Sequence, residues 1–408
     1  MNHFSELSLC PVLQNNLTRH CFTKPTPVQA AAIPPALAGR DVVATAQTGT
    51  GKTLAFLLPM LQSLITRKDG PGVQALILTP TRELAIQINE ALGPLAAGTG
   101  IRSTVVVGGL NEVTQLRGIK SGAQILIATP GRLCDFLNRN LVNLSGVRTL
   151  VLDEADRMLD MGFLPSLRII LEKIPASRQT LFFSATIEKS VAHLIEKYLR
   201  NPERITIGAT TKPIDQVDLH HYEVEQDRKL GLLVKLLHEE QGSFLVFART
   251  KHGTDRLAKK LGASGIKTGR IHGNRSQNQR NQALDGFKDG GYRVLVATDV
   301  AARGIHVDGI AHVVNYDLPQ VPEDFIHRVG RTGRAGARGT ASTFSTRAER
   351  SEIKKIERAL NIRLIAREVA QDLPREVKGP SKVAVMPSPS RGHSSARPSR
   401  GRRWAGGR

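Results

Sequence analysis

Short apolar, β-branched runs alternate with longer stretches of helical periodicity, and this rhythm restricts the fold of the chain more than any other feature. Between residues 41 and 207 the strand-like runs are DVVAT, ALILTP, STVVVGG, QILIAT, TLVLDEAD, TLFFSAT and RITIG. Helix-periodic stretches such as RELAIQINEAL separate them. Strands that are apolar throughout are buried on both faces, and helices between them allow a parallel return, so the pattern predicts an α/β fold with parallel sheets flanked by helices.

The pattern breaks once and then resumes. GATTKPIDQ is small and polar, and after it come FLVFART, TGRIHG, YRVLVATD, AHVVNYDLP and GTASTFS. We predict one α/β domain over residues 1–208, a linker over 209–216, a second α/β domain over 217–372 and a disordered tail over 373–408. The tail is rich in Pro, Ser, Gly and Arg, and such a composition buries too little surface to fold.

Composition supports more than one domain and a polyanionic partner. A chain of 408 residues is too long for one ordinary core. The formal net charge of +21 favours nucleic acid over a membrane surface, although charge for solubility alone is the plain alternative. Cys10, Cys21 and Cys134 are widely spaced, so we expect no disulfide framework, no zinc site and a reducing, cytoplasmic setting. We also expect neither a secretion signal nor a membrane span.

A glycine-lysine-threonine loop lies between the strand-like DVVA and the helix-like LAFLLPM. Gly49 and Gly51 allow backbone amides to converge on an anion, Lys52 adds a positive charge, and Thr53 adds a hydroxyl that can bind magnesium. The usual phosphate-loop pattern has glycine where this chain has Ala46. A glycine-rich turn would explain the loop but not Lys52 and Thr53. The predicted phosphate and nucleotide contacts are Ala46, Gln47, Thr48, Gly49, Thr50, Gly51, Lys52 and Thr53.

Two adjacent acids follow the apolar run TLVL. In a parallel sheet they lie at the carboxyl edge, where ligands bind. We expect Asp153 to hold Mg²⁺ with Thr53, and Glu154 to orient or activate the attacking water. A helix N-terminal cap is the alternative for DEAD taken alone.

In order along the chain, the motifs resemble those of the DEAD-box ATP-dependent RNA helicases. They are AQTGTGKT (46–53), PTRELA (80–85), the glycine pair at 108–109, TPGR (129–132), DEAD (153–156), SAT (184–186), ATDVAARG (297–304) and HRVGRTGR (327–334). TKHG and RIHGNRSQ are most similar to the bacterial RhlE-type branch. The resemblance covers roughly residues 4–365 and implies two RecA-like domains that close together on ATP and single-stranded RNA.

The resemblance also implies roles at the nucleotide. CFTKPTPVQ is similar to the family's adenine-binding motif, in which Gln29 faces the adenine edge, Phe22 stacks on the ring and Phe4 packs beside it. The residues alone indicate a Pro-rich turn and favour Phe22 as a core residue, so the adenine contact rests on the resemblance. Cys21 stands where the family commonly has glycine, which puts the local backbone geometry in question.

HRVGRTGR spaces three arginines, Arg328, Arg331 and Arg334, at intervals of three, on one face with His327. A solvated basic helix would show the same spacing. By resemblance, Arg331 and Arg334 are arginine fingers that reach the γ-phosphate when the domains close, adding about 10³ to 10⁵ in rate.

By resemblance, Asp156, Ser184, Thr186 and His327 couple hydrolysis to domain contact, with Ser184 and Thr186 expected to bond to Asp156. A polar turn after TLFF is the alternative for SAT.

The resemblance nominates RNA contacts that are glycine amides, hydroxyls and arginines, groups that bind phosphate and sugar rather than bases. We therefore expect binding that is largely independent of sequence, sensitive to salt and selective for the 2′-hydroxyl of RNA. The residues are Pro80, Thr81, Arg82, Gly109, Thr129, Gly131 and Arg132, then Arg249, Gln277, Arg280, Thr298 and Gly304.

One departure concerns ATP. The chain has ARGIH where the family commonly has ARGxD, so His306 replaces an aspartate that contacts the ribose and the fingers. We hypothesise weaker or pH-sensitive nucleotide binding, because imidazole titrates near neutrality. A histidine that bonds the ribose equally well is the alternative.

Three function classes follow. The leading one is an ATP-dependent enzyme that unwinds short RNA duplexes with hydrolysis of ATP to ADP and phosphate. The others are an ATP-controlled RNA clamp or scaffold in RNA decay or ribosome assembly, and a DNA-directed motor, which the RNA-type motifs disfavour. The basic tail with Trp404 would hold RNA loosely or act only as a solubilising end.

Overall fold

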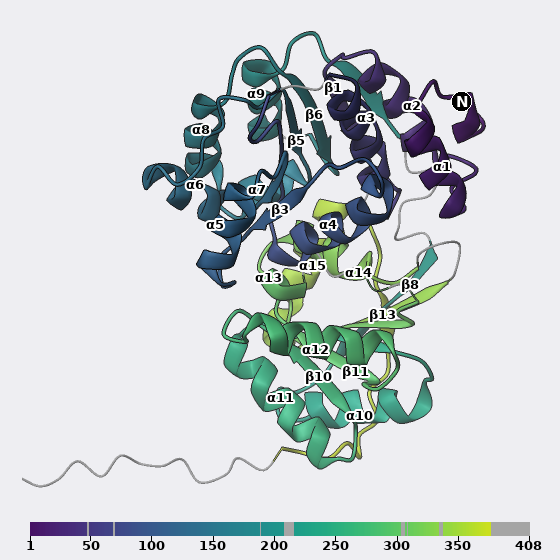
Figure 1. Ribbon diagram of the computed structural model, residues 1–408. Helices are drawn as coiled ribbons and strands as arrows, with labels where there is room; N and C mark the ends of the chain where they lie inside the picture. Colours follow the sequence, from purple (N-terminus) through teal and green to yellow (C-terminus); the bar gives the residue numbers. More distant parts are fainter. Residues whose placement is uncertain are drawn as a thin grey trace, which may run out of the picture.

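Two seven-stranded sheets, formed one after the other along the chain, organise the molecule (Figure 1). The computed structural model describes residues 1–46, 49–67, 70–187, 189–207, 216–302, 307, 309–333 and 338–376. We call the part up to residue 207 the first domain and the part from residue 216 the second domain. Most of the predicted linker, and the predicted tail beyond residue 376, lie outside the described residues, so the predicted boundaries stay predictions.

Every described strand pairing is parallel, as the alternating pattern predicts. The first sheet consists of β1 (Val42–Thr45), β2 (Ala75–Leu78), β3 (Ser103–Val106), β4 (Ile125–Ala128), β5 (Thr149–Leu152), β6 (Gln179–Ser184) and β7 (Glu203–Thr206). The second consists of β8 (Val217–Glu223), β9 (Phe244–Phe247), β10 (Thr268–Ile271), β11 (Val294–Ala297), β12 (His312–Asn315), β13 (Gly339–Ser345) and β14 (Ile365–Arg367).

The two sheets share one topology. Their spatial orders are β3-β4-β2-β5-β6-β1-β7 and β10-β11-β9-β12-β13-β8-β14. Adding seven to each strand number of the first order gives the second. Loops that follow equivalent strands therefore lie at equivalent places in the two domains.

Helices cover both faces of each sheet, because the apolar side chains of each strand alternate between two cores. In β1, for example, Val42 and Ala44 join one cluster and Val43 joins the other. The first cluster also takes α1 (Pro11–Arg19), α2 (Pro27–Leu37), α3 (Lys52–Arg67) and α4 (Arg82–Ala96). The second takes α5 (Glu112–Lys120), α6 (Pro130–Asn138), α7 (Ala155–Asp160), α8 (Leu164–Lys173) and α9 (Lys189–Tyr198).

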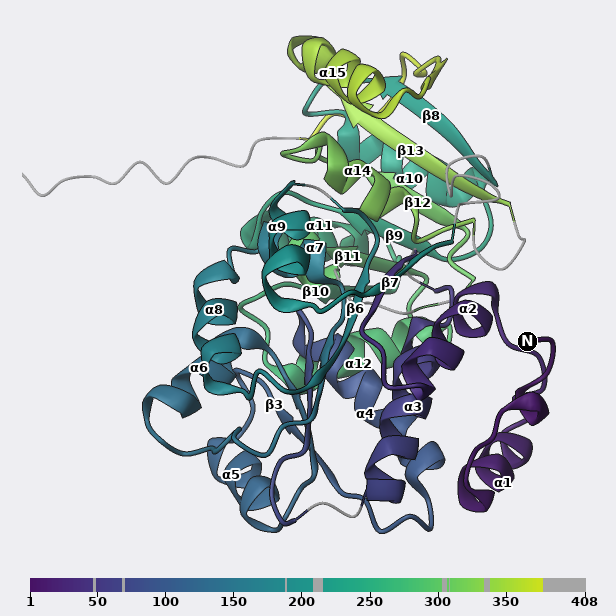
Figure 2. The same cartoon turned by 90° about the horizontal axis from the view of Figure 1, so that it is seen from above.

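The second sheet is covered in the same way. One face packs against α10 (Lys229–Glu239) and α11 (Lys251–Ala263). The other packs against α12 (Gln277–Lys288), α13 (Asp299–Ala302), α14 (Pro322–Val329) and α15 (Arg350–Leu360). Figure 2, seen from above, separates α15 from α12.

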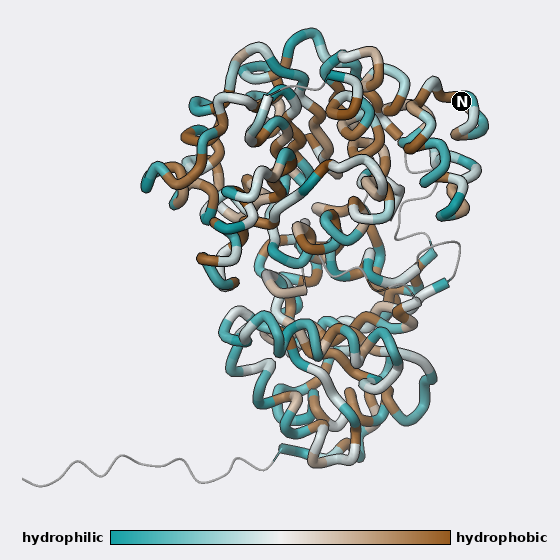
Figure 3. Tube along the Cα trace, viewed as in Figure 1, coloured by the Kyte–Doolittle hydropathy of each residue, from teal (hydrophilic) through white to brown (hydrophobic). Residues whose placement is uncertain are grey.

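Hydropathy follows this layering (Figure 3), in which α11 and α12 are drawn largely in hydrophilic colours. Within the described part of the chain, no helix combines the length and the apolar character needed to cross a membrane.

Candidate active site

The glycine-rich loop leads from β1 into α3 at the carboxyl edge of the first sheet. Gly49 and Gly51 have φ values of +87° and +91°, a left-handed backbone that suits glycine. Lys52 begins α3 and is buried, and its Nζ donates to the carbonyl oxygen of Ala46 at 2.9 Å. A helix N-terminus after such a loop has free amides for an anion. Gln47 and Thr48 lie outside the described residues.

Gln29 joins the adenine-type motif to this loop. Its Oε1 accepts from the amide of Thr26 at 2.9 Å, and its Nε2 donates to the carbonyl oxygen of Gly51 at 3.0 Å. A Cβ added at Gly51 would lie 2.4 Å from that Nε2, so glycine is required there. Each end of the amide keeps one further hydrogen-bonding site, as the predicted adenine contact needs.

Phe22 is not a core residue. Its side chain is 40% exposed, whereas Phe4 is only 3% exposed, and the two rings meet edge to face with centroids 6.5 Å apart. An exposed ring held by a buried one is available for stacking, so the core alternative is wrong.

The backbone before Phe22 is strained at Cys21. Cys21 has φ of +57°, a left-handed conformation that disfavours any residue with a Cβ. The cysteine that replaces the family's usual glycine therefore occupies a position whose geometry favours glycine.

The two acids lie where the sequence predicts, directly after β5. Asp153 and Glu154 are 3% and 4% exposed, and Asp153 Oδ1 accepts from the amide of Glu154 at 3.0 Å. Glu154 has φ of +51° and ψ of +52°, a conformation that costs about 1–3 kcal/mol and is typical of functional sites. Its side chain makes no capping bond to α7, so the helix-cap alternative is wrong for Glu154. Instead Arg157 Nη1 donates to Glu154 Oε2 at 2.6 Å.

The two carboxyl groups differ in proton affinity. Burial raises the pKa of Asp153 to about 7, although the nearby ammonium of Lys52 opposes the change. Burial would raise the pKa of Glu154 as well, but Arg157, Lys52 and Arg331 outweigh it and bring the pKa down to about 2. Glu154 is therefore ionised throughout the neutral range.

The donors suit a magnesium ion that is shared with phosphate. Among the described residues no group of three His, Cys, Asp or Glu side chains could hold a metal by itself. Asp153 and the hydroxyl of Thr53 lie at one sheet edge beside the phosphate loop. Mg²⁺ is commonly bound by one or two carboxylates together with substrate phosphates, so this set fits it.

A compact hydrogen-bond network joins DEAD to SAT. Asp156 Oδ2 accepts from the amides of Ala185 (3.0 Å) and Thr186 (2.9 Å) and from the Thr186 hydroxyl (3.1 Å). Ser184 Oγ accepts from the amide of Asp156 at 3.3 Å and donates to the carbonyl oxygen of Thr186 at 2.7 Å. The expected bonds are present, and their coupling role stays a prediction.

The second domain brings positive charge to these acids. Arg331 follows α14, is 4% exposed, and lowers the pKa of Glu154 across the domain boundary. His327 lies near Asp156 and Arg157. Burial and the charge of Arg157 hold its pKa below the usual value, and the charge of Asp156 opposes them only in part. Arg334 and His306 lie outside the described residues.

Arg328 has a different use. It is buried, forms ion pairs with Asp299 (2.5 Å from Nε to Oδ1), and donates to Asn315 Oδ1 and to the carbonyl oxygen of Asp317. It holds the second domain together. A solvated basic helix does not describe either Arg328 or Arg331.

The RNA candidates of the first domain follow three neighbouring strands, β3, β4 and β2. Thr81 caps α4 by accepting from the amide of Leu84 at 3.3 Å, and Arg82 packs over Gly109. A Cβ at Gly109 would lie 2.1 Å from Arg82 Nη1. The remaining candidates, Pro80, Thr129, Gly131 and Arg132, follow β2 and β4.

The candidates of the second domain follow the equivalent strands, β10, β11 and β9. Arg249 follows β9 and Thr298 follows β11, while Gly304 lies outside the described residues. The shared topology explains why motifs so distant in sequence form matching sets.

Gln277 and Arg280, which follow β10, contact the first domain. Arg280 Nη2 lies 2.8 Å from Glu83 Oε1, and Gln277 Nε2 donates to the same oxygen at 3.1 Å. All three side chains are buried. The sequence analysis assigned no role to Glu83, which lies inside the quoted PTRELA motif, or to Arg157, which directly follows DEAD. The partner of Glu83 lies far away in the sequence, and the partner of Arg157 lies one helical turn before it.

Comparison with known proteins shows the family of the chain. The family model described as DEAD/DEAH box helicase matches residues 26–194, and the model of the helicase conserved C-terminal domain matches residues 228–336. The DEAD-box ATP-dependent RNA helicase CshA of Geobacillus kaustophilus is 40% identical over 386 residues, which are 94% of this chain and 82% of that relative. The chain belongs to the DEAD-box ATP-dependent RNA helicases.

Another CshA, from Streptococcus pneumoniae serotype 4, is 41% identical over 328 residues, 80% of this chain. This DEAD-box chain spans 62% of the length of that relative. Both relatives are named CshA, so the RhlE-type branch stays a prediction.

Solved structures match the two RecA-like domains and their arrangement. Saccharomyces cerevisiae Dbp5 bound to RNA and ADP BeF3 is 31% identical, covers 90% of this chain and 96% of its own, and gives a TM-score of 0.79. A DEAD box protein from Methanococcus jannaschii is 37% identical over 90% of this chain and 99% of its own, but its TM-score is 0.53. The TM-score is therefore higher for the RNA-bound Dbp5, although its sequence identity is lower.

Proposed function

We propose that this DEAD-box protein is an RNA-dependent ATPase that binds single-stranded RNA across both domains and locally separates short RNA duplexes. Family membership and the site between the domains support the proposal. ATP is hydrolysed to ADP and phosphate.

The first domain holds the nucleotide. The amides of the glycine loop and Lys52 bind the phosphates, and Gln29 and Phe22 bind the adenine. Thr53 and Asp153 would hold Mg²⁺, which neutralises phosphate charge during phosphoryl transfer. Glu154, ionised and fixed by Arg157, orients the attacking water.

The observation that carries the proposal is the charge that the second domain places at the acids of the first. Arg331 lowers the pKa of Glu154, and Arg280 pairs with Glu83. Both interactions require the domains to be in contact. RNA that touches both domains stabilises that contact and so accelerates hydrolysis, because Arg331, and with it Arg334, then reaches the γ-phosphate.

The RNA contacts are sequence-independent. The candidates from the two domains are mainly hydroxyls, arginines and glycines, at equivalent strand ends. Unwinding of a short duplex follows when one strand is held in a conformation that the duplex cannot adopt.

Steady-state ATP hydrolysis with and without single-stranded RNA tests the proposal. Glu154→Gln is the inactive control, and DNA of equal length is the specificity control. We expect strong stimulation by RNA alone, together with strand release from a short duplex. Hydrolysis that RNA does not stimulate would refute the closing mechanism. Stimulated hydrolysis without strand release would favour an ATP-controlled RNA clamp.

A further inference from the structure

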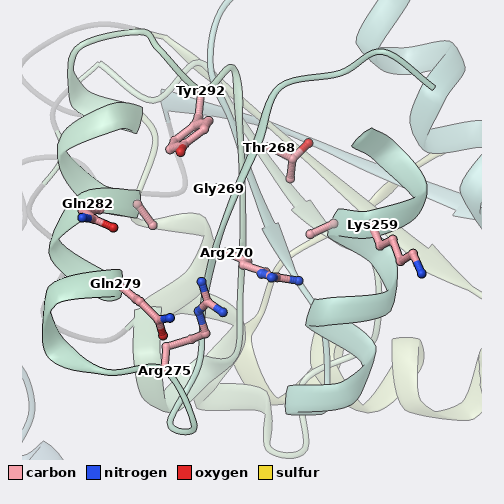
Figure 4. A pocket seen from close by; sticks show the side chains of 10 residues that line it. Lys259, Thr268, Gly269, Arg270, Arg275, Gln279, Gln282 and Tyr292 are labelled. Atoms are coloured by element: carbon pink, nitrogen blue, oxygen red, sulfur yellow. The ribbon is translucent and has the colours of Figure 1, made fainter. Parts of the chain in front are cut away.

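A cavity of about 480 Å³ lies in the second domain, at the free edge of its sheet (Figure 4). β10 is the last strand at this end of the sheet, and three consecutive residues of it, Thr268 to Arg270, line the cavity. Lys259 of α11 lies at one side of it, and Gln279 and Gln282 of α12 line the other side. Its volume lies in the range of small-molecule and nucleotide sites, about 300–1,000 Å³.

The lining is strongly cationic. Lys259, Arg270 and Arg275 contribute to it, and no carboxylate does. Among the described residues, Arg270 is the one of these three that forms an ion pair, with its Nη1 3.1 Å from Asp255 Oδ1. In the part of the chain that the structure describes, Arg275 Nε is buried without a hydrogen-bond acceptor. That nitrogen is enclosed by protein, so the preference of the cavity for a ligand with anionic oxygens comes from its three cationic side chains and the absence of a lining carboxylate.

An aromatic ring closes one end of the cavity. Tyr292 packs on two glycines: a Cβ at Gly269 would lie 3.1 Å from the ring, and a Cβ at Gly286 would lie 2.6 Å from it. The ring is therefore fixed in place, with its remaining surface toward the cavity. A fixed ring beside three cations suits a nucleobase and its phosphate, since bases stack on aromatic side chains whatever their sequence.

The cavity adjoins the RNA candidates but is separate from them. On α12, Gln277 and Arg280 face the first domain, whereas Gln279 and Gln282 face the cavity. Arg275 lies in the segment that joins β10 to α12 and lines the cavity. A strand leaving the site between the domains can pass Arg275 and turn onto the outer side of this helix.

We propose that this cavity, which we name the β10 groove, binds one or two further nucleotides of a single-stranded RNA that is already held between the domains. The inference rests on the proposed function and extends it. Phosphate contacts come from Lys259, Arg270 and Arg275, and base stacking comes from Tyr292. An acidic peptide is the other polyanion to consider, but it would make no use of the fixed ring.

The test compares RNA length. Binding of a short RNA of about 6 nucleotides and a long one of about 20 nucleotides is measured by fluorescence anisotropy, with an ATP analogue present, over a salt series. Lys259→Gln with Arg275→Gln removes two groove charges. Lys354→Gln with Arg358→Gln removes two exposed charges of α15, at the opposite end of the same domain, and is the matched control.

The groove variant should bind the long RNA about 10-fold more weakly, with a salt slope smaller by about 1.4, and should bind the short RNA as the unmodified chain does. The control variant should match the unmodified chain at both lengths. The proposal would be overturned if the groove variant lost equal affinity for both RNAs, if it lost no affinity at all, or if the control variant showed the same loss.

Failure of the proposed function looks different, because the unmodified chain would then bind neither RNA. The last measurement is the binding of an oligoglutamate peptide to the unmodified chain and to the groove variant. If it binds the unmodified chain but not the groove variant, while RNA binding is unaffected at both lengths, the groove takes acidic peptides and the RNA proposal is wrong.

Discussion

Replacing Glu83 with Gln should selectively weaken the closed state of the two domains. Glu83 Oε1 lies 2.8 Å from Arg280 Nη2 and accepts a hydrogen bond from Gln277 Nε2 at 3.1 Å. All three side chains are buried. Burial lowers the pKa of Arg280, and the charge of Glu83 opposes that shift. Without the carboxylate, closure would bury a guanidinium that has no counter-charge.

The size of the effect follows from burial. Removing one partner of a buried ion pair costs about 3–5 kcal/mol. The amide of Gln can still accept one hydrogen bond, so we take the lower end, about 3 kcal/mol, or about 100-fold. When the domains are apart both groups are in water, so the cost applies only to closure.

The assay is the RNA concentration that gives half-maximal stimulation of ATP hydrolysis. It should rise about 100-fold in Glu83→Gln, whereas hydrolysis without RNA and thermal unfolding should change little. Glu90→Gln, on the exposed side of the same helix, is the matched control and should behave as the unmodified chain.

Adding Arg280→Gln should recover part of the loss, because the double variant has no unpaired charge. Strictly additive losses from Glu83→Gln and Arg280→Gln would refute the reasoning, as would a loss of basal hydrolysis equal to the loss of stimulated hydrolysis. Additivity would instead favour Arg280 as a direct RNA ligand.

Four further substitutions test other parts of the site. Cys21→Gly should raise the free energy of unfolding by about 1 kcal/mol, measured by denaturant titration, because glycine relieves the left-handed backbone; Cys21→Ala should not, and an equal gain would contradict the explanation. Arg157→Gln removes the largest attraction that holds the pKa of Glu154 at about 2, so that pKa should rise. Hydrolysis should then fall as the pH drops through the raised pKa of Glu154, so the variant should lose activity at a higher pH than the unmodified chain, whose own acid limb comes from Asp153; a kcat profile that matches the unmodified chain would count against it. Thr186→Val removes one of the three hydrogen bonds that Asp156 Oδ2 accepts and should reduce unwinding about 10-fold more than ATP hydrolysis, whereas equal losses would argue against coupling. His306→Asp should lower the KM for ATP or flatten its dependence between about pH 6 and 8, and an unchanged KM across that range would reject the histidine hypothesis.

The sequence by itself determined the kind of fold and the chemistry of the first domain. Strands that are apolar throughout, separated by helix-periodic stretches, leave few solutions other than parallel sheets covered on both faces, and the structure has two of them. The phosphate loop and the acids after β5 lie at one sheet edge because parallel strands all end on the same side. Local spacing and strand polarity suffice for such a prediction.

Spacing alone did not determine which groups each arginine contacts. Three arginines at equal intervals look alike in HRVGRTGR, but Arg328 is enclosed by Asp299 and Asn315, while Arg331 reaches the acids of the first domain. Likewise Phe22 is exposed, although an isolated Phe before a helix is commonly part of a core.

Only the tertiary structure decided the contacts between the domains and the shape of the β10 groove. Gln277 is 194 residues from Glu83 along the chain, and Arg280 is farther still, so no periodicity relates them to that carboxylate. The groove depends on the strand order, which makes β10 an edge and sets α11 and α12 on opposite faces beside it. Strand and helix patterns are local in sequence, whereas strand order and domain closure come from packing summed over the whole chain, which a local pattern does not contain.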